Sequence, residues 1–293
     1  MNLDERKVRV SQWMVLNNGL YQVCGQTLPQ LPAGAYTCSL DCYGNPLFQA
    51  KELHVDELID FTDSLSARIL GEVSRFWQLG ERFKKFGFLH RRGYLFYGKQ
   101  GSGKSSLVHQ IVARITAAGN LALFCEQPNV FVTCASRFRQ VEPERPMVCI
   151  FEDIDAIIAA YGDSDLLQWL DGNQQVDQAV NIATTNYPEK LDRRIIARPR
   201  RFDRILRIDA PEDRLRAAYF ARKLPEQTAA ERQHWVRLTD GLSFAALAEL
   251  IISVHCLGND LDETVALLKS LDADTPSSTE YFLGGVGPVP AVA

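Results

Sequence analysis

Apolar residues are spaced in two different ways along the chain, and the spacing predicts where its structural parts begin and end. Up to about residue 57, short runs rich in β-branched and aromatic residues are separated by turn-forming residues, which predicts β-strands. These runs lie at residues 8–10, 20–23, 35–40 and 47–50, with turn signals at residues 17–19, 31–34 and 43–46. We therefore expect a small β-rich N-terminal domain over residues 1–57.

A different pattern starts at about residue 58, where helical and strand-like stretches alternate. A helical stretch ends near Trp77, and a helix ending at Gly119 follows a glycine-rich turn. The apolar, β-prone runs are short, as is typical of parallel strands buried on both faces. We expect an α/β domain over residues 58–210, with a parallel sheet sandwiched by helices. The predicted strands lie at residues 92–97, 121–125, 147–151 and 180–184.

The C-terminal part of the chain loses the strand pattern after Pro211. Pro211 suits the first turn of a helix, and Glu212 and Asp213 complement the helix dipole there. We expect a small helical lid domain over residues 211–272. Residues 273–293 contain many Gly, Pro, Ser and Thr residues, so we expect a flexible C-terminal tail.

Composition and charge narrow the compartment and the partners. The formal net charge of −4 provides no global attraction for a nucleic-acid backbone or an anionic membrane. The seven cysteines form no CxxC pair, and acidic residues stand where a secretory signal would be basic. No apolar run approaches the ~18 residues of a membrane span. We expect a reduced, soluble, cytoplasmic protein without a membrane segment.

The strongest chemical signal is a glycine-rich turn between a predicted strand and a predicted helix. Residues 98–105 read Gly-Lys-Gln-Gly-Ser-Gly-Lys-Ser and fit the phosphate-binding pattern GxxxxGK[ST]. Glycines let successive N–H groups face a phosphate, Lys104 reaches the β and γ oxygens, and the Ser105 hydroxyl ligates Mg²⁺. We expect ATP and Mg²⁺ as cofactors. The residues expected to bind the nucleotide are Gly98, Lys99, Gln100, Gly101, Ser102, Gly103, Lys104, Ser105 and Ser106.

Carboxylates follow the apolar run at residues 147–151, at the end of a predicted buried strand. Glu152, Asp153 and Asp155 would leave the sheet beside the glycine-rich turn in this topology. One carboxylate would hold Mg²⁺ and the other would orient the attacking water. We expect Glu152 and Asp153 to be catalytic and Glu152 to be a metal ligand with Ser105. The residue order leaves open which acid orients the water, and the alternative is a pair of solvated acids at a strand end.

Two further stretches complete a set of four motifs. Thr184-Thr185-Asn186 end the next predicted strand, and residues 191–204 read Leu-Asp-Arg-Arg-Ile-Ile-Ala-Arg-Pro-Arg-Arg-Phe-Asp-Arg. The four motifs together resemble those of AAA+ ATPases, whose last stretch reads LDxALxRPGRFDR, and the resemblance covers about residues 60–255. The Glu152-Asp153 order inverts the family's usual Asp-Glu. In this it is similar to the mitochondrial AAA chaperones that translocate the folded Rieske protein, without their membrane segment.

The resemblance implies roles for residues beyond the phosphate loop. Asn186 matches the sensor 1 position and would position water near the γ-phosphate. Arg198 and Arg201 match arginine fingers, which stabilise charge on the phosphoryl group bound by a neighbouring subunit. Arg200 replaces the family's glycine, and residues 241–247 are similar to the lid stretch GxSGADL. The alternative for the arginine cluster is a solvated or nucleic-acid-binding basic patch.

We therefore expect an ATP hydrolase that forms a homo-oligomeric ring, a hexamer or alternatively a heptamer, and remodels or translocates a protein client. One alternative is a nucleotide-gated assembly or loading factor that acts on nucleic acid or a larger complex, with ATP as a switch. Another is nucleotide binding without hydrolysis. Residues 126–146 contain no aromatic-apolar-Gly triplet of the kind that threading AAA rings use. This favours a ring that does not thread polypeptide in the common manner.

Overall fold

The computed structural model describes residues 12–15, 21–25, 27–53, 65–171, 175–196 and 200–273. The chain divides into two compact units, Met1–Pro32 and Ala33–Ala293. In the first unit, β1 (Gln12–Val15) pairs antiparallel with β2 (Tyr21–Cys24), so that Val15 lies opposite Tyr21. The strand predicted at residues 20–23 is found as β2, whereas the strand predicted at residues 8–10 lies outside the described residues.

The second unit contains a seven-stranded sheet with the strand order β4-β3-β6-β7-β8-β5-β9. Every neighbouring pair in this sheet is parallel except β3 and β4. All residues of β6, β7 and β8 are buried, as expected for parallel strands covered on both faces. The predicted α/β fold with a mostly parallel sheet is confirmed. The strands are β3 (Gly34–Leu40), β4 (Pro46–Ala50), β5 (Arg91–Tyr97), β6 (Leu121–Phe124), β7 (Met147–Phe151), β8 (Ala179–Thr185) and β9 (Arg204–Arg207).

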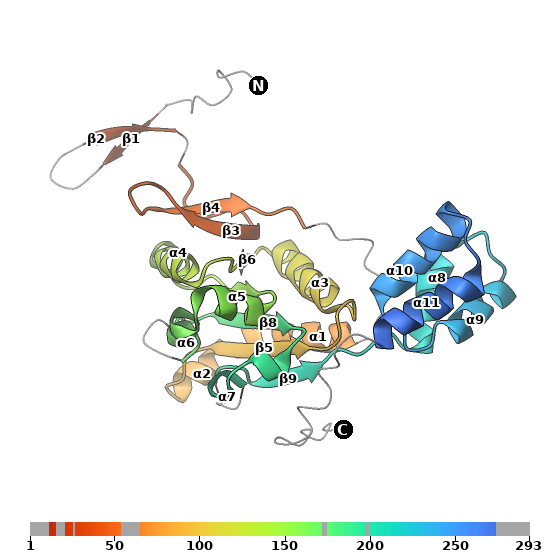
Figure 1. Cartoon of the computed structure of the whole chain (residues 1–293). Helices are drawn as coiled ribbons and strands as arrows, with labels where there is room; N and C mark the ends of the chain where they lie inside the picture. The colour runs from red at the N-terminus through yellow and green to blue at the C-terminus, as the bar shows by residue number, and fades with distance from the viewer. Residues whose placement is uncertain are drawn as a thin grey trace. The chain divides into compact units, whose positions relative to one another are not determined.

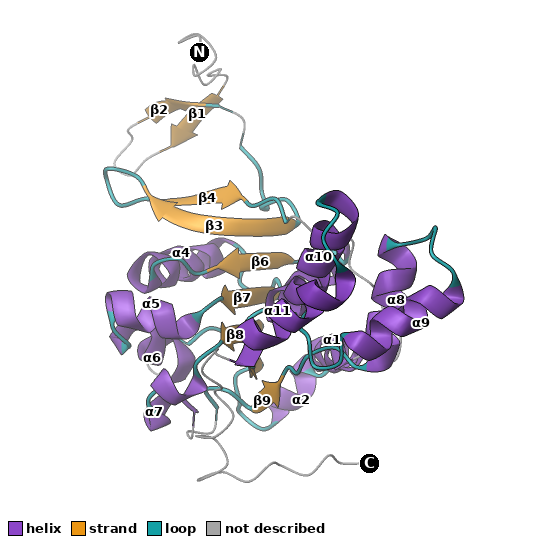
Figure 2. Cartoon of the chain, turned by 45° about the vertical axis from the view of Figure 1, so that its right-hand side comes forward, coloured by secondary structure: helices purple, strands orange, loops and turns teal. Residues whose placement is uncertain are grey.

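Helices cover both faces of the sheet. On one face, α1 (Leu65–Trp77) and α3 (Lys104–Ala117) bury their apolar stripes against alternate residues of the central strands. On the other face lie α4 (Pro128–Val141), α5 (Ile154–Tyr161) and α6 (Ser164–Asp171), as Figure 2 shows. Short helices α2 (Gly80–Lys85) and α7 (Arg193–Ile196) and the 3₁₀ turn η3 (Pro188–Lys190) complete the layers.

The β3–β4 hairpin belongs to this sheet, although the sequence pattern assigned residues 1–57 to a separate β-rich domain. β3 pairs parallel with β6, from Gly34 opposite Leu121 to Thr37 opposite Phe124, and the hairpin forms one edge of the sheet (Figure 1). The turn between the two strands was predictable from the residue types at 43–46. In the structure, Asp41 stabilises this turn by accepting hydrogen bonds from the backbone N–H groups of Tyr43 and Asn45. The strand partner was not predictable, since β6 lies 87 positions further along the chain.

The lid region consists of four α-helices around a small apolar core of its own (Figure 1). They are α8 (Asp213–Lys223), α9 (Ala229–Leu238), α10 (Phe244–Ile251) and α11 (Leu261–Ala273), with a π-helical turn η4 (Ile252–Cys256) after α10. The helices predicted after Pro211 are present, while the domain boundaries at residues 58, 211 and 273 stay predictions. Among the described residues, no helix is both long and apolar enough to cross a membrane.

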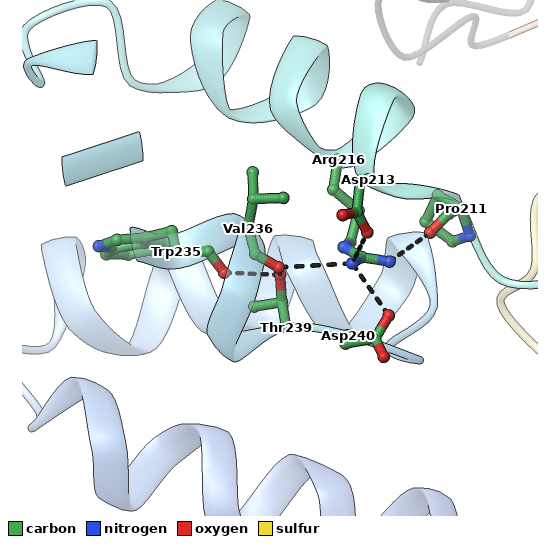
Figure 3. A network of polar contacts seen from close by, with 7 residues as sticks. All are labelled: Pro211, Asp213, Arg216, Trp235, Val236, Thr239 and Asp240. Atoms are coloured by element: carbon green, nitrogen blue, oxygen red, sulfur yellow. Dashed lines mark hydrogen bonds and ion pairs between the residues drawn. The ribbon is translucent and has the colours of Figure 1, made fainter. Parts of the chain in front are cut away.

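A buried arginine ties the lid to the segment that leads into it (Figure 3). Arg216 of α8 is only 2% exposed and donates to the Pro211 carbonyl oxygen at 2.7 Å. It also pairs with Asp213 at 2.5 Å and with Asp240, just after α9, at 3.0 Å. Because a buried guanidinium needs acceptors, these contacts fix the first lid helix onto the connecting segment and onto α9.

Candidate nucleotide-binding site

The glycine-rich turn joins β5 to α3 and leaves the start of α3 open. Gly103 is the N-cap residue in a left-handed conformation (φ 102°), and no side chain caps the first N–H groups of the helix. Uncapped N–H groups and the helix dipole together favour an anion at this position. The first turn exposes Ser105 and Ser106, so the Ser105 hydroxyl is accessible.

Lys104 folds back onto the loop. Its ammonium donates to the carbonyl oxygens of Gly98 at 2.8 Å and of Lys99 at 2.7 Å, and the residue is 6% exposed. Burial lowers the pKa of Lys104 to about 8, and the charges of Asp153 and Asp155 oppose this shift. The structure therefore brings Lys104 together with the acids that follow β7.

Asp153 lies beside the polar end of the neighbouring strand β8. Its backbone N–H donates to Thr184 Oγ1 at 3.0 Å, and Asn186 Nδ2 donates to Asp153 Oδ1 at 3.3 Å. Asp153 adopts a left-handed backbone conformation (φ 46°, ψ 54°), which is uncommon for a residue with a β-carbon and is found most often at functional sites. Asp153 and Asn186 therefore lie together at the carboxyl edge of the sheet.

Glu152 points away from this pair, toward α3. Its Oε1 lies 3.9 Å from Nε2 of His109 on α3, the helix that also carries Ser105. A hydroxyl and a carboxylate are the hard oxygen ligands that Mg²⁺ prefers, so Ser105 and Glu152 fit the expected metal site by chemistry. No group of three or more His, Cys, Asp or Glu side chains in the described part of the chain could hold a metal ion alone. Nucleotide phosphate oxygens and water would have to complete the coordination.

Arg201, which the resemblance matches to an arginine finger, is paired with a carboxylate of its own chain. Arg201 is 4% exposed, and its Nε and terminal nitrogens lie 2.9 and 3.0 Å from the two carboxylate oxygens of Asp171 in the same chain. A second terminal nitrogen donates to the Arg194 carbonyl oxygen. The guanidinium would have to leave Asp171 to act on the nucleotide of a neighbouring subunit, and its role as a finger stays a prediction. Arg198, the other predicted finger, lies outside the described residues.

The residues after Arg201 hold this segment against β5. Phe202 is buried, the backbone N–H of Asp203 donates to the Gly93 carbonyl oxygen, and the Asp203 carboxylate accepts from the Gly93 N–H at 2.8 Å. Arg200, in the place of the family's glycine, has a left-handed backbone (φ 76°). The motif therefore has a structural role of its own beside the expected catalytic one.

The segment between β6 and β7 contains one continuous helix, α4, with only a short turn before and after it. The helix carries an aromatic residue, Phe131, which is 1% exposed and packs edge-on against Phe151 and Trp169. Phe131 is therefore a core residue.

The model of the "ATPase family associated with various cellular activities (AAA)" matches residues 94–210. Residues 94–210 are an AAA domain. This AAA domain starts in β5 and includes the phosphate loop, Glu152 and Asp153, Asn186, and the arginine segment at residues 191–204. The predicted family is thereby confirmed, and it supports the predicted enzyme class, an ATP hydrolase.

Relatives of this chain include three proteins that match between 58% and 67% of it. The i-AAA protease supercomplex subunit YME1 of the mitochondrial inner membrane of Saccharomyces cerevisiae is 30% identical over 205 residues, 62% of this chain and 27% of YME1. ATP-dependent zinc metalloprotease FtsH 1 of Sorangium cellulosum is 29% identical over 67% of this chain and 33% of its own length. The proteasome-activating nucleotidase of Aeropyrum pernix is 28% identical over 58% and 46%.

The chain thus spans between about a quarter and a half of the length of these relatives. The finer resemblance to Rieske-translocating chaperones stays a prediction.

Sequence reasoning missed two contacts, one within the AAA domain and one in the lid region. His109 beside Glu152 carries no sequence signal, since a histidine on a helix is common and its partner lies 43 positions away. Phe244 at the start of α10 does carry one, because it stands where the similar stretch GxSGADL has a glycine. An aromatic residue in place of a glycine indicates a contact that the family pattern lacks.

Proposed function

We propose that this protein hydrolyses Mg-ATP at the subunit interfaces of a homo-oligomeric ring and uses the cycle to remodel or translocate a protein client. The observation that carries the proposal is the hydrogen bond between Asn186 and Asp153, next to a phosphate loop with an uncapped helix start. Two polar groups from neighbouring strands meet where an attacking water would have to be held.

The phosphate loop would bind the nucleotide by exchanging contacts. Lys104 now donates to two loop carbonyls, and phosphate oxygens would replace them as acceptors. Beside the loop, Tyr97, Gly98, Ile208, Ala210 and Gly241 are among the residues that line a cavity of about 240 Å³. This volume is small for a whole ligand and suits the base of the nucleotide.

The directions of the two acids support a different role for each. Asp153, held by Asn186, would accept a hydrogen bond from the water that attacks the γ-phosphorus, while the bond to the β-phosphate oxygen breaks. Glu152, turned toward α3, would hold Mg²⁺ together with Ser105. Bound Mg²⁺ would neutralise charge on the phosphate oxygens. Arg198 of an adjacent subunit would supply the remaining positive charge, which is the reason for a ring, with a hexamer as the expected form.

A protein client is supported by the relatives, whose names describe proteases and a proteasome activator. The buried position of Phe131 supports a ring that does not grip a threaded chain through the segment after β6. The alternative, a loading factor on nucleic acid, remains the second candidate because of the arginine-rich segment at residues 193–207.

The test measures ATP hydrolysis over a range of protein concentrations, with oligomer size recorded in parallel, for the wild type and for Asp153→Ala. Turnover per subunit should rise as the oligomer forms, disappear when Mg²⁺ is chelated, and be absent in Asp153→Ala although this variant still binds ATP. A rate that is independent of concentration would contradict the ring, and turnover retained in Asp153→Ala would contradict the assignment of the water. Stimulation by DNA would favour the loading factor.

A further inference from the structure

Two buried threonines at the end of β8 bond to the segment that follows β7. Thr184 and Thr185 are 2% and 0% exposed. Thr184 Oγ1 accepts a hydrogen bond from the backbone N–H of Asp153 at 3.0 Å, and Thr185 Oγ1 donates to Oδ1 of Asp155 at 2.6 Å. Two hydrogen bonds, one to the backbone and one to a carboxylate, therefore tie the ends of the two neighbouring strands together.

Thr185 also fixes the turn that carries Asn186. Its hydroxyl accepts a hydrogen bond from the backbone N–H of Tyr187, two residues further on, at 3.0 Å. Bonds of this kind, from a backbone N–H to a nearby hydroxyl, close tight turns. Asn186 is enclosed by this turn, since Thr185 before it belongs to β8 and Tyr187 after it is bonded to Thr185.

The contact between Asn186 and Asp153 needs such support. Its length of 3.3 Å lies beyond the usual range of about 2.7–3.2 Å for N–H···O bonds. The bond from Thr185 to Asp155, at 2.6 Å, lies in the range of about 2.5–2.7 Å for hydroxyl bonds to an ionised carboxylate, which are the stronger kind. The shorter bond is therefore better suited to hold the two turns together.

Asp155 has no role in the mechanism proposed above, although it is the third acid after β7. It lies in the first turn of α5, where the helix dipole favours a carboxylate, and Asp153 is the N-cap residue of the same helix. A group that holds Asp155 therefore also holds the start of α5 and, with it, the backbone of Asp153.

We propose that Asp155 and Thr185 are positioning residues, whose hydrogen bond holds the turn of Asn186 against the turn of Asp153. The proposal rests on the function proposed above, since both residues act through Asn186 and Asp153. Loss of the Thr185 hydroxyl removes the bonds to Asp155 and to the Tyr187 N–H together, so the pair no longer keeps one geometry. Turnover then falls, because a displacement of about 1 Å at a catalytic group can cost about a hundredfold in rate.

The experiment compares Thr185→Val and Thr185→Ser with the full-length wild type. Valine keeps the shape of threonine without the hydroxyl, whereas serine keeps the hydroxyl. Steady-state kinetics give kcat and KM for ATP, and calorimetry gives the affinity for ADP with Mg²⁺. We expect kcat of Thr185→Val to fall roughly ten- to a hundredfold while the ADP affinity stays unchanged, and Thr185→Ser to keep most of the wild-type kcat.

Asp155→Ala tests the same bond from its other end. It should lower kcat to a similar degree, and the double variant Thr185→Val/Asp155→Ala should lower it no further, because each single change already removes the bond. Asp155 is half-buried and Thr185 stays in place in this variant, so Asp155→Ala keeps the test decisive if Thr185→Val does not fold.

Thr264→Val is the matched control. Thr264 of α11 is 7% exposed, and its hydroxyl donates to the Asp260 carbonyl oxygen, also at 2.6 Å. The variant loses a buried hydroxyl bond in the lid region, so it should lower the melting temperature and leave kcat unchanged. A fall in kcat that merely followed lower stability would appear in this variant as well, and would overturn the proposal.

Unchanged kcat in Thr185→Val or in Asp155→Ala would also overturn the proposal, as would a loss that Thr185→Ser shares or a double variant far below either single one. Asp153→Ala separates the two levels of the argument. If the wild type does not hydrolyse ATP, or Asp153→Ala hydrolyses it equally well, the proposed function fails and this inference with it. If Asp153→Ala is inactive while Thr185→Val and Asp155→Ala turn over like the wild type, the function stands and this inference is wrong.

Discussion

Gly93 shows how one residue supports the arginine segment. An alanine β-carbon at this position would lie 2.1 Å from the carbonyl oxygen of Arg201, and this oxygen belongs to the backbone. The same glycine exchanges two hydrogen bonds with Asp203, so β5 and the segment around Asp203 cannot separate without losing these bonds. Gly93 is therefore required by close approach, and any side chain here has to displace the whole segment.

We predict that Gly93→Ala destabilises the protein by roughly 1–3 kcal/mol or more, the range for overpacked sites. Chemical denaturation followed by circular dichroism measures it. Gly71→Ala is a matched control, because Gly71 lies in α1 with no atom within 4 Å of the added β-carbon, and alanine favours a helix by up to about 1 kcal/mol. Equal stability of Gly93→Ala and the wild type would show that the segment does not pack on β5 as closely as described.

Arg200 carries backbone strain that a glycine would relieve. Its φ of 76° lies in the left-handed region, which costs about 1–2 kcal/mol for a residue with a β-carbon. We predict that Arg200→Gly raises the free energy of unfolding by up to about 1 kcal/mol, less what is lost with the Phe88 ring contact of the guanidinium. Arg200→Ala removes that contact and keeps the strain, so a stability of this variant at or above that of Arg200→Gly would contradict the explanation.

Residue types predicted the phosphate site better than they predicted the arginine segment. The glycine-rich loop is a local sequence pattern, and the residue types from Gly98 to Ser105 are enough to predict its backbone conformation. Arg201 fits its motif equally well, but its environment is set by Asp171, which lies 30 positions earlier on α6. A motif gives the residue type and cannot report which carboxylate of the folded chain is nearest.

The ion pair between Asp171 and Arg201 joins two elements, α6 and the segment that leads into β9. Both side chains are largely buried, at 15% and 5% exposure. Removing one partner of a buried pair leaves the other charge without compensation. We predict that Asp171→Asn lowers the free energy of unfolding by about 3–5 kcal/mol.

Asp163→Asn is the matched control for this prediction. Asp163 pairs with Arg194, which is 65% exposed, so its replacement should change stability far less. Thermal unfolding of both variants in the same buffer decides the matter. Similar losses for the two variants would mean that Arg201 finds other acceptors and that Asp171 does not hold it in place.

Secondary-structure elements were predictable where their apolar pattern was continuous. The strands β6, β7 and β8 read as apolar runs because both of their faces are buried. β9 was missed because its sequence, Arg-Ile-Leu-Arg, is short and begins and ends with a charge, which is how an exposed edge strand is composed. The β3–β4 hairpin was found as strands, but its membership of the large sheet depends on pairing with β6, and no local pattern contains that information.

At the level of the whole molecule, the proposed function requires that each active site is built from two subunits. Lys104 and Asp153 belong to one chain and lie close enough for the charge of Asp153 to act on the pKa of Lys104, whereas Arg198 would act on a neighbour's nucleotide. Lys104→Ala should lose phosphate binding and Arg198→Ala should lose hydrolysis, so each variant alone should be inactive. A mixture of the two, assembled together, contains interfaces in which an intact loop faces an intact Arg198.

We predict that an equal mixture of Lys104→Ala and Arg198→Ala recovers about a quarter of the wild-type turnover, since half of the loops and half of the fingers are intact and they combine at random. Lys104→Ala mixed with Asp153→Ala is the control and should stay inactive, because both residues belong to the same loop-bearing chain and no interface can combine them. Steady-state hydrolysis of the remixed oligomers measures the recovery. If the first mixture is as inactive as the control, Arg198 does not act across the interface, and the ring then has to serve a purpose other than completing the active site.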